Sequence, residues 1–210
     1  VVHLLNNSSE LNTRAMIIVA LVSIWGIRLS SYLFKRFMDK EKMDYRYQEM
    51  LDGWKGHYGV HSFFKIFLLQ AGTSLLIGYP LALAMTTNSS DLNLLDYFGI
   101  LLWAVGFLIE SFADKQKSAF KKLHPNKPCN IGLWKTSRHP NYLGEIVLWY
   151  GVGCLMVSQI HFVFALSTPI LLHLIIYYIS GVAMLEKKYT NDRRYDEYRE
   201  STNKLFFKLN

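Results

Sequence analysis

The chain has 210 residues, of which 51% are apolar and 19% charged, and its formal net charge is +7. This length suits a single domain, and the basic balance points to an anionic partner, either nucleic acid or a membrane surface. Its two cysteines, Cys129 and Cys154, form no CxxC or Cys/His ligand pattern, so a zinc site and a thiol redox centre have no support. A disulfide between them is not expected either, because Cys154 lies roughly 20 Å inside a predicted helix whose entrance follows Cys129.

Five apolar stretches are long enough to cross a bilayer, which takes about 20 residues. They cover residues 14–34, 62–85, 93–112, 140–158 and 162–184. Pro80 and Pro169 fall inside two of them, where membrane helices tolerate proline. The sequence therefore predicts an all-α, polytopic transmembrane helical bundle that forms one membrane domain over residues 1–210.

The basic residues lie on alternate connections between these stretches. Segments 35–61, 113–139 and 185–210 hold 20 of the 23 Lys and Arg residues, whereas segments 1–13, 87–92 and 159–161 hold none. By the positive-inside rule the basic connections and the C-terminus face the cytoplasm or the mitochondrial matrix. A soluble helical bundle would not predict this alternation, and the charge is explained without nucleic acid. The pattern predicts an integral membrane protein of the endoplasmic reticulum, the mitochondrial inner membrane or the bacterial cytoplasmic membrane.

Within the first basic connection, residues 39–55 have apolar side chains at helical spacing with charges between them. This pattern predicts a helix that lies in the membrane interface.

Ionisable side chains within membrane spans are costly and mark candidate sites. They are Arg28, Lys65, Asp96, Glu110, Glu145 and His173. Arg28 and Lys65 are long enough to reach the interface, and Asp96 lies near the outer end, where we expect it to be solvated. His173 fits a hydrogen-bonded packing residue better than a catalyst. Carboxylates are too short to reach water, so Glu110 and Glu145 are the better site candidates.

The third span continues into the basic connection as one helical stripe of Glu110, Asp114, Lys117 and Lys121. Its carboxylates lie deep and could accept from ribose hydroxyls or an amide, while its shallower amines could pair with phosphates. Taken alone, the stripe is better explained by surface ion pairs one turn apart.

The segment Ser137-Arg-His-Pro-Asn-Tyr-Leu-Gly-Glu145 opens the fourth span. Pro140 is a helix start signal, and the free N–H groups of a helix N-terminus favour phosphate, with Arg138 and His139 as further donors. A capped membrane helix with an interfacial Arg and Tyr142 is the simpler explanation.

That explanation does not account for Asn141 and Glu145, which point to the same side one turn apart. Gly144 beside them would let a ring or another backbone approach closely. The last span ends at Leu185-Glu186, and the polar, aromatic tail after it could be solvated or lie on the surface.

Several of these segments together resemble the steroid 5α-reductase-like membrane proteins, and most closely their bacterial-type members. They are Trp25-Gly-Ile-Arg28-Leu29, Asp44-Tyr-Arg-Tyr47, Glu110 to Phe120, Ser137 to Glu145, Leu185-Glu186-Lys187 and the Tyr195/Tyr198 tail. The Arg-His-Pro-Asn-Tyr-x-Gly-Glu string is specific to the superfamily. Sterol reductases use NADPH there, while isoprenylcysteine carboxyl methyltransferases carry a related string and use S-adenosylmethionine.

The resemblance implies that Asp114 and Asn141 contact the nicotinamide and ribose, with Glu145 nearby, and that Lys121 and Arg138 meet phosphates. The full predicted cofactor site is Glu110, Asp114, Lys117, Lys121, Arg138, His139, Asn141, Tyr142, Glu145 and Glu186. The catalytic residues of those enzymes lie on helices nearer the N-terminus, and the motifs identify no counterparts here.

The leading hypothesis is a membrane-embedded, NADPH-dependent reductase of a C=C bond in a lipid or steroid-like enone. One alternative is an S-adenosylmethionine-dependent methyltransferase acting on a lipid or isoprenoid. The other is a non-catalytic subunit of a membrane complex that retains the fold. The expected partners are membrane lipids and a lipophilic substrate.

Overall fold

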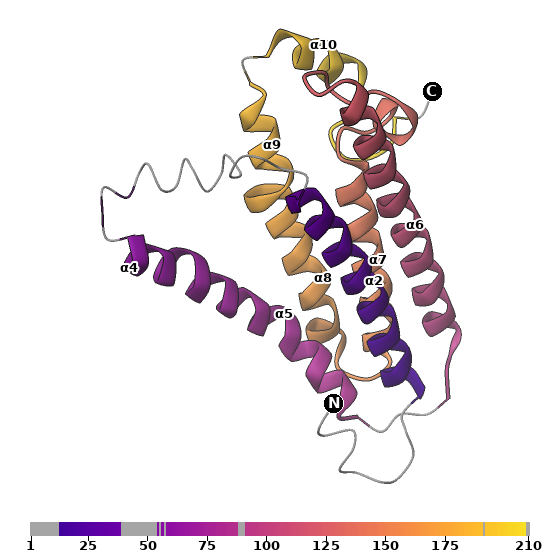
Figure 1. The fold of residues 1–210 in the computed structure, drawn as a ribbon. Coiled ribbons are helices and arrows are strands. Elements are labelled where there is room, and N and C mark those ends of the chain that lie inside the picture. The colour runs from indigo at the N-terminus through magenta and orange to yellow at the C-terminus, as the bar shows by residue number, and fades with distance from the viewer. Residues whose placement is uncertain are drawn as a thin grey trace.

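The computed structural model describes residues 13–38, 54, 56, 58–87, 91–190 and 192–208. These residues are almost entirely helical, as predicted (Figure 1). The elements are α2 (Thr13–Met38), α4 (Tyr58–Ser62), the π-helix η1 (Phe63–Leu68), α5 (Leu69–Met85), α6 (Leu94–Leu123), the 3-10 helix η2 (Gly132–Lys135), α7 (Pro140–Val157), α8 (Phe162–Leu174), the π-helix η3 (Ile175–Ser180), α9 (Val182–Lys188) and α10 (Arg193–Ser201).

Four helices among the described residues are long and apolar enough to cross a membrane. They are Thr13–Met38, Tyr58–Met85, Leu94–Leu123 and Phe162–Lys188, and they coincide with four of the five predicted spans. The fifth, residues 140–158, corresponds to α7, which is not among these four. Asn141 and Glu145 make α7 less apolar, and most of its side chains are buried by neighbouring helices. The chain is thus a membrane-type helical protein, and a fifth crossing by α7 remains a prediction.

Helices α6 and α7 pack with their backbones in direct contact at four glycines, which lie seven residues apart on each helix. A Cβ placed on Gly106 would lie 2.5 Å from the Gly144 carbonyl oxygen, and one placed on Gly151 would lie 2.5 Å from the Gly99 carbonyl oxygen. Small residues allow this approach, and close packing drives helix association in lipid. The space beside Gly144 is therefore filled by the backbone of α6, at Glu110, and is not open to a ligand ring.

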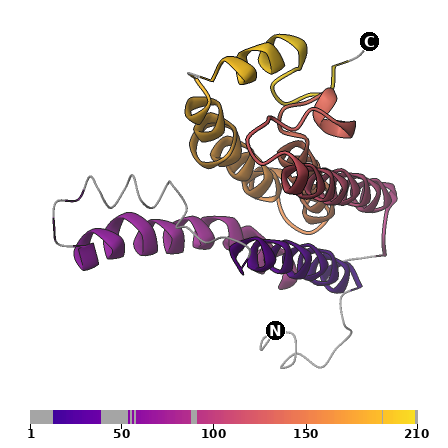
Figure 2. The ribbon, with the colours of Figure 1, turned by 45° about the horizontal axis from the view of Figure 1, so that its top comes forward.

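The α7 helix is the centre of the bundle. Its Leu148, Trp149 and Val152 belong to a buried apolar cluster that also includes Ile18 of α2 and Trp103 of α6. Helix α8 packs on another side of α7, where Gly153 faces Pro169. Figure 2 shows α6, α7 and α8 grouped together.

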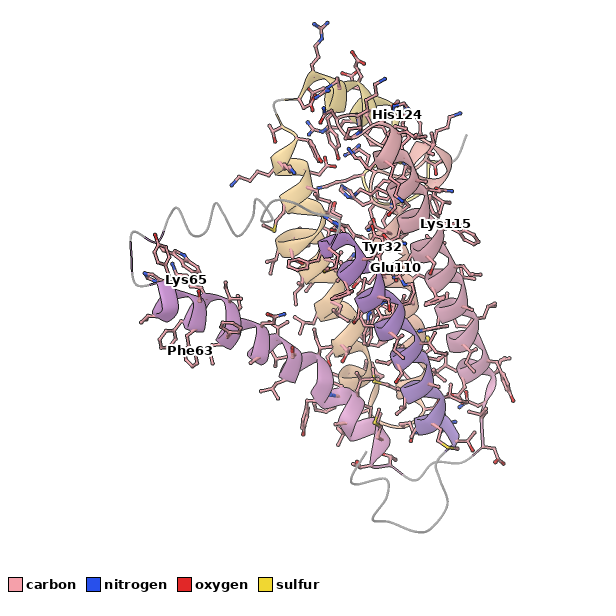
Figure 3. The ribbon with its side chains drawn as sticks, in the orientation of Figure 1. Tyr32, Phe63, Lys65, Glu110, Lys115 and His124 are labelled. Atoms are coloured by element: carbon pink, nitrogen blue, oxygen red, sulfur yellow. The ribbon has the colours of Figure 1, made fainter. Side chains whose placement is uncertain are left out.

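The second long helix diverges from this group. Its α5 part packs on α8, where the Thr168 hydroxyl donates to the Ile77 carbonyl. Its α4 and η1 part packs, among the described residues, on little besides its own continuation, and Phe63 and Lys65 lie well away from Glu110 (Figure 3). The predicted interfacial helix over residues 39–55 lies outside the described residues, except for the buried Trp54.

The prediction that Asp96 is solvated is wrong. Asp96 is fully buried and takes a two-pronged ion pair from Arg14, with Nε to Oδ1 at 2.8 Å and Nη2 to Oδ2 at 2.7 Å. Asp96 also accepts from the Asn93 backbone, which completes a capping box at the start of α6. A carboxylate that caps a helix and pairs with arginine can remain charged away from water. This ion pair fastens α2 to α6.

Candidate functional site

The predicted site residues gather at the end of the bundle that holds loop 124–139 and the C-terminal tail, here called the basic end. Helix α6 runs without a break from Leu94 to Leu123, so it carries Glu110, Asp114, Lys117 and Lys121 toward this end over roughly 16 Å, at 1.5 Å per residue. Helix α7 begins there at Pro140, and α9 ends there. Figure 3 shows Glu110 behind α2 and His124 at the top of α6.

Glu110 and Asp114 share one cation, the guanidinium of Arg28. Arg28 Nη1 donates to Asp114 Oδ2 at 2.7 Å, and Nη2 contacts Glu110 Oε1. The Trp25 indole donates to the other Glu110 oxygen at 3.1 Å. Arg28 therefore pairs with carboxylates from the inside of the bundle and does not simply extend to the interface. The two carboxylates of the α6 stripe thus pair with Arg28 of α2, and not with the lysines of their own helix.

Glu145 adds a third carboxylate to this acidic cluster of Glu110, Asp114 and Glu145. It is close enough to Asp114 and Arg28 to interact with both electrostatically, yet no side chain or backbone group in the described parts of the chain hydrogen-bonds to it. Asn141, one turn earlier, interacts with Asp114, and its own Oδ1 is buried without a partner there. A buried acceptor that lacks a donor is costly, so Asn141 Oδ1, with the half-buried Glu145 carboxylate one turn away, suits a ligand that supplies hydrogen-bond donors.

Glu186 organises the surface of the basic end. Its carboxylate accepts from Arg138 Nε at 3.0 Å and Nη2 at 3.1 Å, from the Tyr195 hydroxyl at 2.9 Å, and lies 2.9 Å from His139 Nε2. The π-helix η3 precedes α9, and its wider turn shifts the register of the residues that follow. Glu186 therefore joins the start of α7 to α9 and α10.

Arg138 also fastens the C-terminal tail. Its Nη1 donates to the carbonyl oxygens of Arg199 and Thr202, and its backbone N–H donates to Asn203. The Tyr198 hydroxyl donates to the Trp134 carbonyl, and burial raises the pKa of this phenol. These bonds hold the tail against loop 132–139, while several of its side chains remain exposed. The guanidinium of Arg138 is largely engaged within the protein, so a phosphate would share it.

A pocket of about 280 Å³ opens between the end of α6, loop 124–139 and α9–α10. Its cationic lining residues are Lys117, Lys121, Lys127, Arg138, Lys188 and Arg194, and the one carboxylate is Asp192. Trp134, Tyr189, Tyr195 and Tyr198 supply aromatic surface. A pocket with this charge balance and several rings suits an anionic ligand that contains an aromatic ring.

The lysines of the α6 stripe occupy this basic pocket in different ways. The Lys117 ammonium lies 4.4 Å from the centre of the Trp134 ring, a cation–π geometry. Lys121 donates to the carbonyl oxygens of Pro125 and Lys127, which fixes the loop after α6. Lys117 lies one turn beyond Asp114 on the same helix, so it connects the pocket to the acidic cluster.

His139 lines the same pocket and is 2% exposed. Burial lowers the pKa of its imidazole, although the neighbouring Glu186 carboxylate opposes this shift. With Nε2 donating to Glu186, the buried Nδ1 is an acceptor that has no partner among the described residues. The ring stacks against Tyr142 at 5.8 Å. His139 therefore offers a vacant acceptor to a pocket ligand.

The structure thus brings the predicted residues into two adjoining groups. Glu110, Asp114, Asn141 and Glu145 lie at or beside the acidic cluster. Lys117, Lys121, Arg138 and His139 line the basic pocket, with Glu186 and Tyr142 bonded to or stacked on His139. The sequence analysis did not identify Lys188 and Arg194 as pocket residues, and it did not predict that Arg28 pairs with Glu110 and Asp114. For Arg28, the Trp25–Arg28 motif was a signal that this residue has a role.

The sequence profile of the family described as "Protein of unknown function (DUF1295)" matches residues 1–202. An uncharacterized protein of Schizosaccharomyces pombe is 26% identical over 161 residues, which cover 65% of this chain and 46% of that protein. The chain therefore spans less than half the length of this relative. No solved structure matches the chain. Because the matching profile covers almost the whole sequence, the chain belongs to the DUF1295 family.

Proposed function

We propose that the protein is a membrane-embedded, NADPH-dependent reductase of a C=C bond in a lipid or steroid-like enone. The observation that carries the proposal is the basic pocket, which has six cationic lining residues. One of them, Lys117, lies one turn along α6 from Asp114 of the acidic cluster. The resemblance of the Ser137–Glu145 segment to sterol reductases suggests which anionic ligand the pocket takes. That assignment is ours and goes beyond family membership.

The residues fit the two ends of such a cofactor. Lys117, Lys121 and Lys188 would pair with the phosphates, including the 2′-phosphate that separates NADPH from NADH. The pocket volume of about 280 Å³ is just below the range of roughly 300–1,000 Å³ for small-molecule sites. It can therefore hold only part of a dinucleotide, and the remainder would extend toward the acidic cluster.

At the other end, the vacant acceptors would hold the amide and ribose. Asn141 Oδ1 lacks a donor, and Glu145 has no hydrogen bond within the described part of the chain. Both can accept from the carboxamide N–H groups or the ribose hydroxyls. When bound, the nicotinamide supplies a hydride to the β-carbon of an activated double bond. The acidic cluster would orient the ring, and Trp25 and Arg28 would hold Glu110 in place.

An S-adenosylmethionine-dependent methyltransferase is the second candidate, and one observation favours it. The acidic cluster has three carboxylates around the single guanidinium of Arg28, so its charge balance suits a cationic sulfonium or ammonium group. S-adenosylmethionine carries no phosphates, so this candidate does not explain the six cationic residues that line the basic pocket.

Calorimetric titration of the purified protein in mild detergent tests the proposal. We expect NADPH to bind more tightly than NADH, and Lys188→Gln to reduce that preference, because Lys188 is an exposed residue that lines the pocket. Lys122→Gln, an exposed α6 lysine that does not line the pocket, is the control. Tight binding of S-adenosylmethionine alone would refute the reductase and favour the second candidate. If neither NADPH nor S-adenosylmethionine binds, the remaining candidate is a non-catalytic subunit of a membrane complex.

A further inference from the structure

A line of polar side chains runs from the C-terminal tail into the membrane on the side of α7 that packs against α8. It consists of Lys204, Tyr177, His173 and Tyr150. The Lys204 ammonium lies 4.7 Å from the centre of the Tyr177 ring, and the Tyr177 and His173 rings meet edge to face at 6.3 Å. His173 Nδ1 then lies 3.3 Å from the Tyr150 hydroxyl. None of these residues lines the basic pocket or belongs to the acidic cluster.

Two polar groups of this line have no partner within the described parts of the chain. His173 Nε2 makes no hydrogen bond there, and in the tautomer whose Nδ1 accepts from the Tyr150 hydroxyl it is an N–H donor. The Tyr177 hydroxyl makes none either. Both side chains are partly accessible, so a molecule at the protein surface can reach them.

Unpaired donors at this depth are costly in hydrocarbon, because no water is present to satisfy them. His173 and Tyr177 are four residues apart, which places both donors on one helix face about 6 Å apart along the axis. Tyr177 belongs to the π-helix η3, a distortion that is frequent at functional sites. The face around them is apolar, with Ile170 and Leu174 nearly half exposed.

The composition of the tail suits a membrane interface at this face. Phe206 is 68% exposed between Lys204 and Lys208, and such a mixture of aromatic and basic residues is typical of a membrane–water boundary. A ligand here would meet a cation at the interface and uncharged donors one to two helical turns deeper.

We infer that Lys204, Tyr177 and His173 form a binding site for one anionic glycerolipid of the leaflet on the side of the tail. The lipid phosphate pairs with Lys204, the ester carbonyls accept from the Tyr177 hydroxyl and His173 Nε2, and the acyl chains lie along Ile170 and Leu174. This site is independent of the proposed cofactor pocket, and its ligand is held without being transformed.

Native mass spectrometry in detergent tests the inference, with phosphatidylglycerol and phosphatidylcholine of equal chain length added in turn. We expect one molecule of phosphatidylglycerol to remain bound in preference to phosphatidylcholine. Lys204→Gln should lower that preference about fivefold, the effect of one basic residue near an anionic leaflet. Tyr177→Phe keeps the ring under Lys204 and should weaken retention of both lipids.

Lys135→Gln is the matched control, since Lys135 is an exposed lysine of the neighbouring loop. Equal retention of the two lipids by the unaltered protein would overturn the inference, as would an equal loss in Lys135→Gln and Lys204→Gln. Unchanged retention in Tyr177→Phe would also overturn it. NADPH titration of the same variants should be unaffected, so this result is separable from the test of the proposed function.

Discussion

Arg28 of α2 donates to Asp114 of α6 at 2.7 Å and contacts Glu110, one turn away on the same helix. Arg14 and Asp96, at the other end of the same two helices, are 82 positions apart in the chain, and the same separation recurs between Arg28 and Glu110. Two ion pairs thus fasten α2 to α6 in parallel and in register. Trp25 adds a hydrogen bond to Glu110, and Ile18 belongs to the same buried apolar cluster as Trp103, so the charges act together with these contacts.

Removal of Arg28 should therefore loosen α2. Arg28→Ala leaves Glu110 and Asp114 without their shared cation, and we expect a loss of up to about 3–5 kcal/mol in the free energy of unfolding. Adding Glu110→Gln should recover part of it, because one unpaired charge is removed. Thermal unfolding in detergent measures both effects. Lys35→Ala, at the exposed end of α2, is the control, and an equal effect of the two substitutions would refute this role for Arg28.

The glycine contact between α6 and α7 gives a sharp comparison. A methyl group on Gly106 would lie 2.4 Å from the Leu148 backbone nitrogen, whereas one on Gly78 of α5 would meet nothing within 4 Å. Gly106→Ala should cost at least about 1–3 kcal/mol in the free energy of unfolding, because the helices must separate. Gly78→Ala should be neutral or slightly stabilising. Chemical unfolding in mixed micelles distinguishes them, and equal stability of both variants would contradict the packing described.

The sequence predicted where each site residue lies along its helix better than it predicted which residues of other helices it contacts. Apolar blocks located four helices, and the spacing of Glu110, Asp114, Asn141 and Glu145 placed them near the basic end. The periodicity of one helix does not show which helix it faces, so the partners of Arg28 and Asp96 could not be derived. The buried Arg14–Asp96 pair in particular depends on two segments 82 residues apart.

Two further differences have local causes. From the sequence, the space beside Gly144 could hold either a ligand or the backbone of another helix. In the structure the backbone of α6 occupies it. The polar tail has the composition of a solvated segment, but its carbonyl oxygens accept from Arg138 and Ser137, which lie far away in sequence. Backbone acceptors are present at every residue, so composition does not indicate which of them will be used.

The stability of the basic end should depend on pH through His139. Burial lowers the pKa of this imidazole in the folded protein, whereas an unfolded histidine titrates near about 6.5. As the pH falls through that value the unfolded chain takes up a proton that the folded one does not, so the folded state loses stability. The loss has a maximum slope of about 1.4 kcal/mol per pH unit.

His139→Gln lacks this titration and serves as the reference for unfolding measured between pH 5 and pH 8. The stability of the unaltered protein relative to the variant should be constant above about pH 7.5 and decline below about pH 6.5. A relative stability that rises on acidification would show instead that the imidazolium pairs with Glu186.

The predicted topology places the basic segments 113–139 and 185–210 on the same side of the membrane. After Cys129 and Cys154 are replaced by serine, single cysteines at Lys121, Lys204 and Asp91 can be labelled in sealed vesicles with a membrane-impermeant maleimide. Lys121→Cys and Lys204→Cys should react from the same side, because both positions belong to basic connections. Asp91→Cys, in the connection before α6, should react from the opposite side. Labelling of all three from one side would exclude the five-span arrangement.

The last prediction concerns Asn141 and Glu145, which we expect to act as one polar unit toward the cofactor. Glu145 has no hydrogen bond from the described residues, and Asn141 Oδ1 is a buried acceptor without a donor. Glu145→Gln keeps the size of the side chain and removes its charge. Calorimetric affinity for NADPH should fall by about 1.5–3 kcal/mol, the usual worth of a hydrogen bond to a charged group.

Asn141→Ala should weaken NADPH binding as well, and the double variant should lose less than the sum of the two, because neighbouring groups that hold one ligand are coupled. The melting temperature without cofactor should change little in Glu145→Gln, since no bond within the described residues is lost. A variant that unfolds readily while its folded fraction binds NADPH with unaltered affinity would make Glu145 a packing residue of α7. The cofactor would then have to be held by the basic pocket alone.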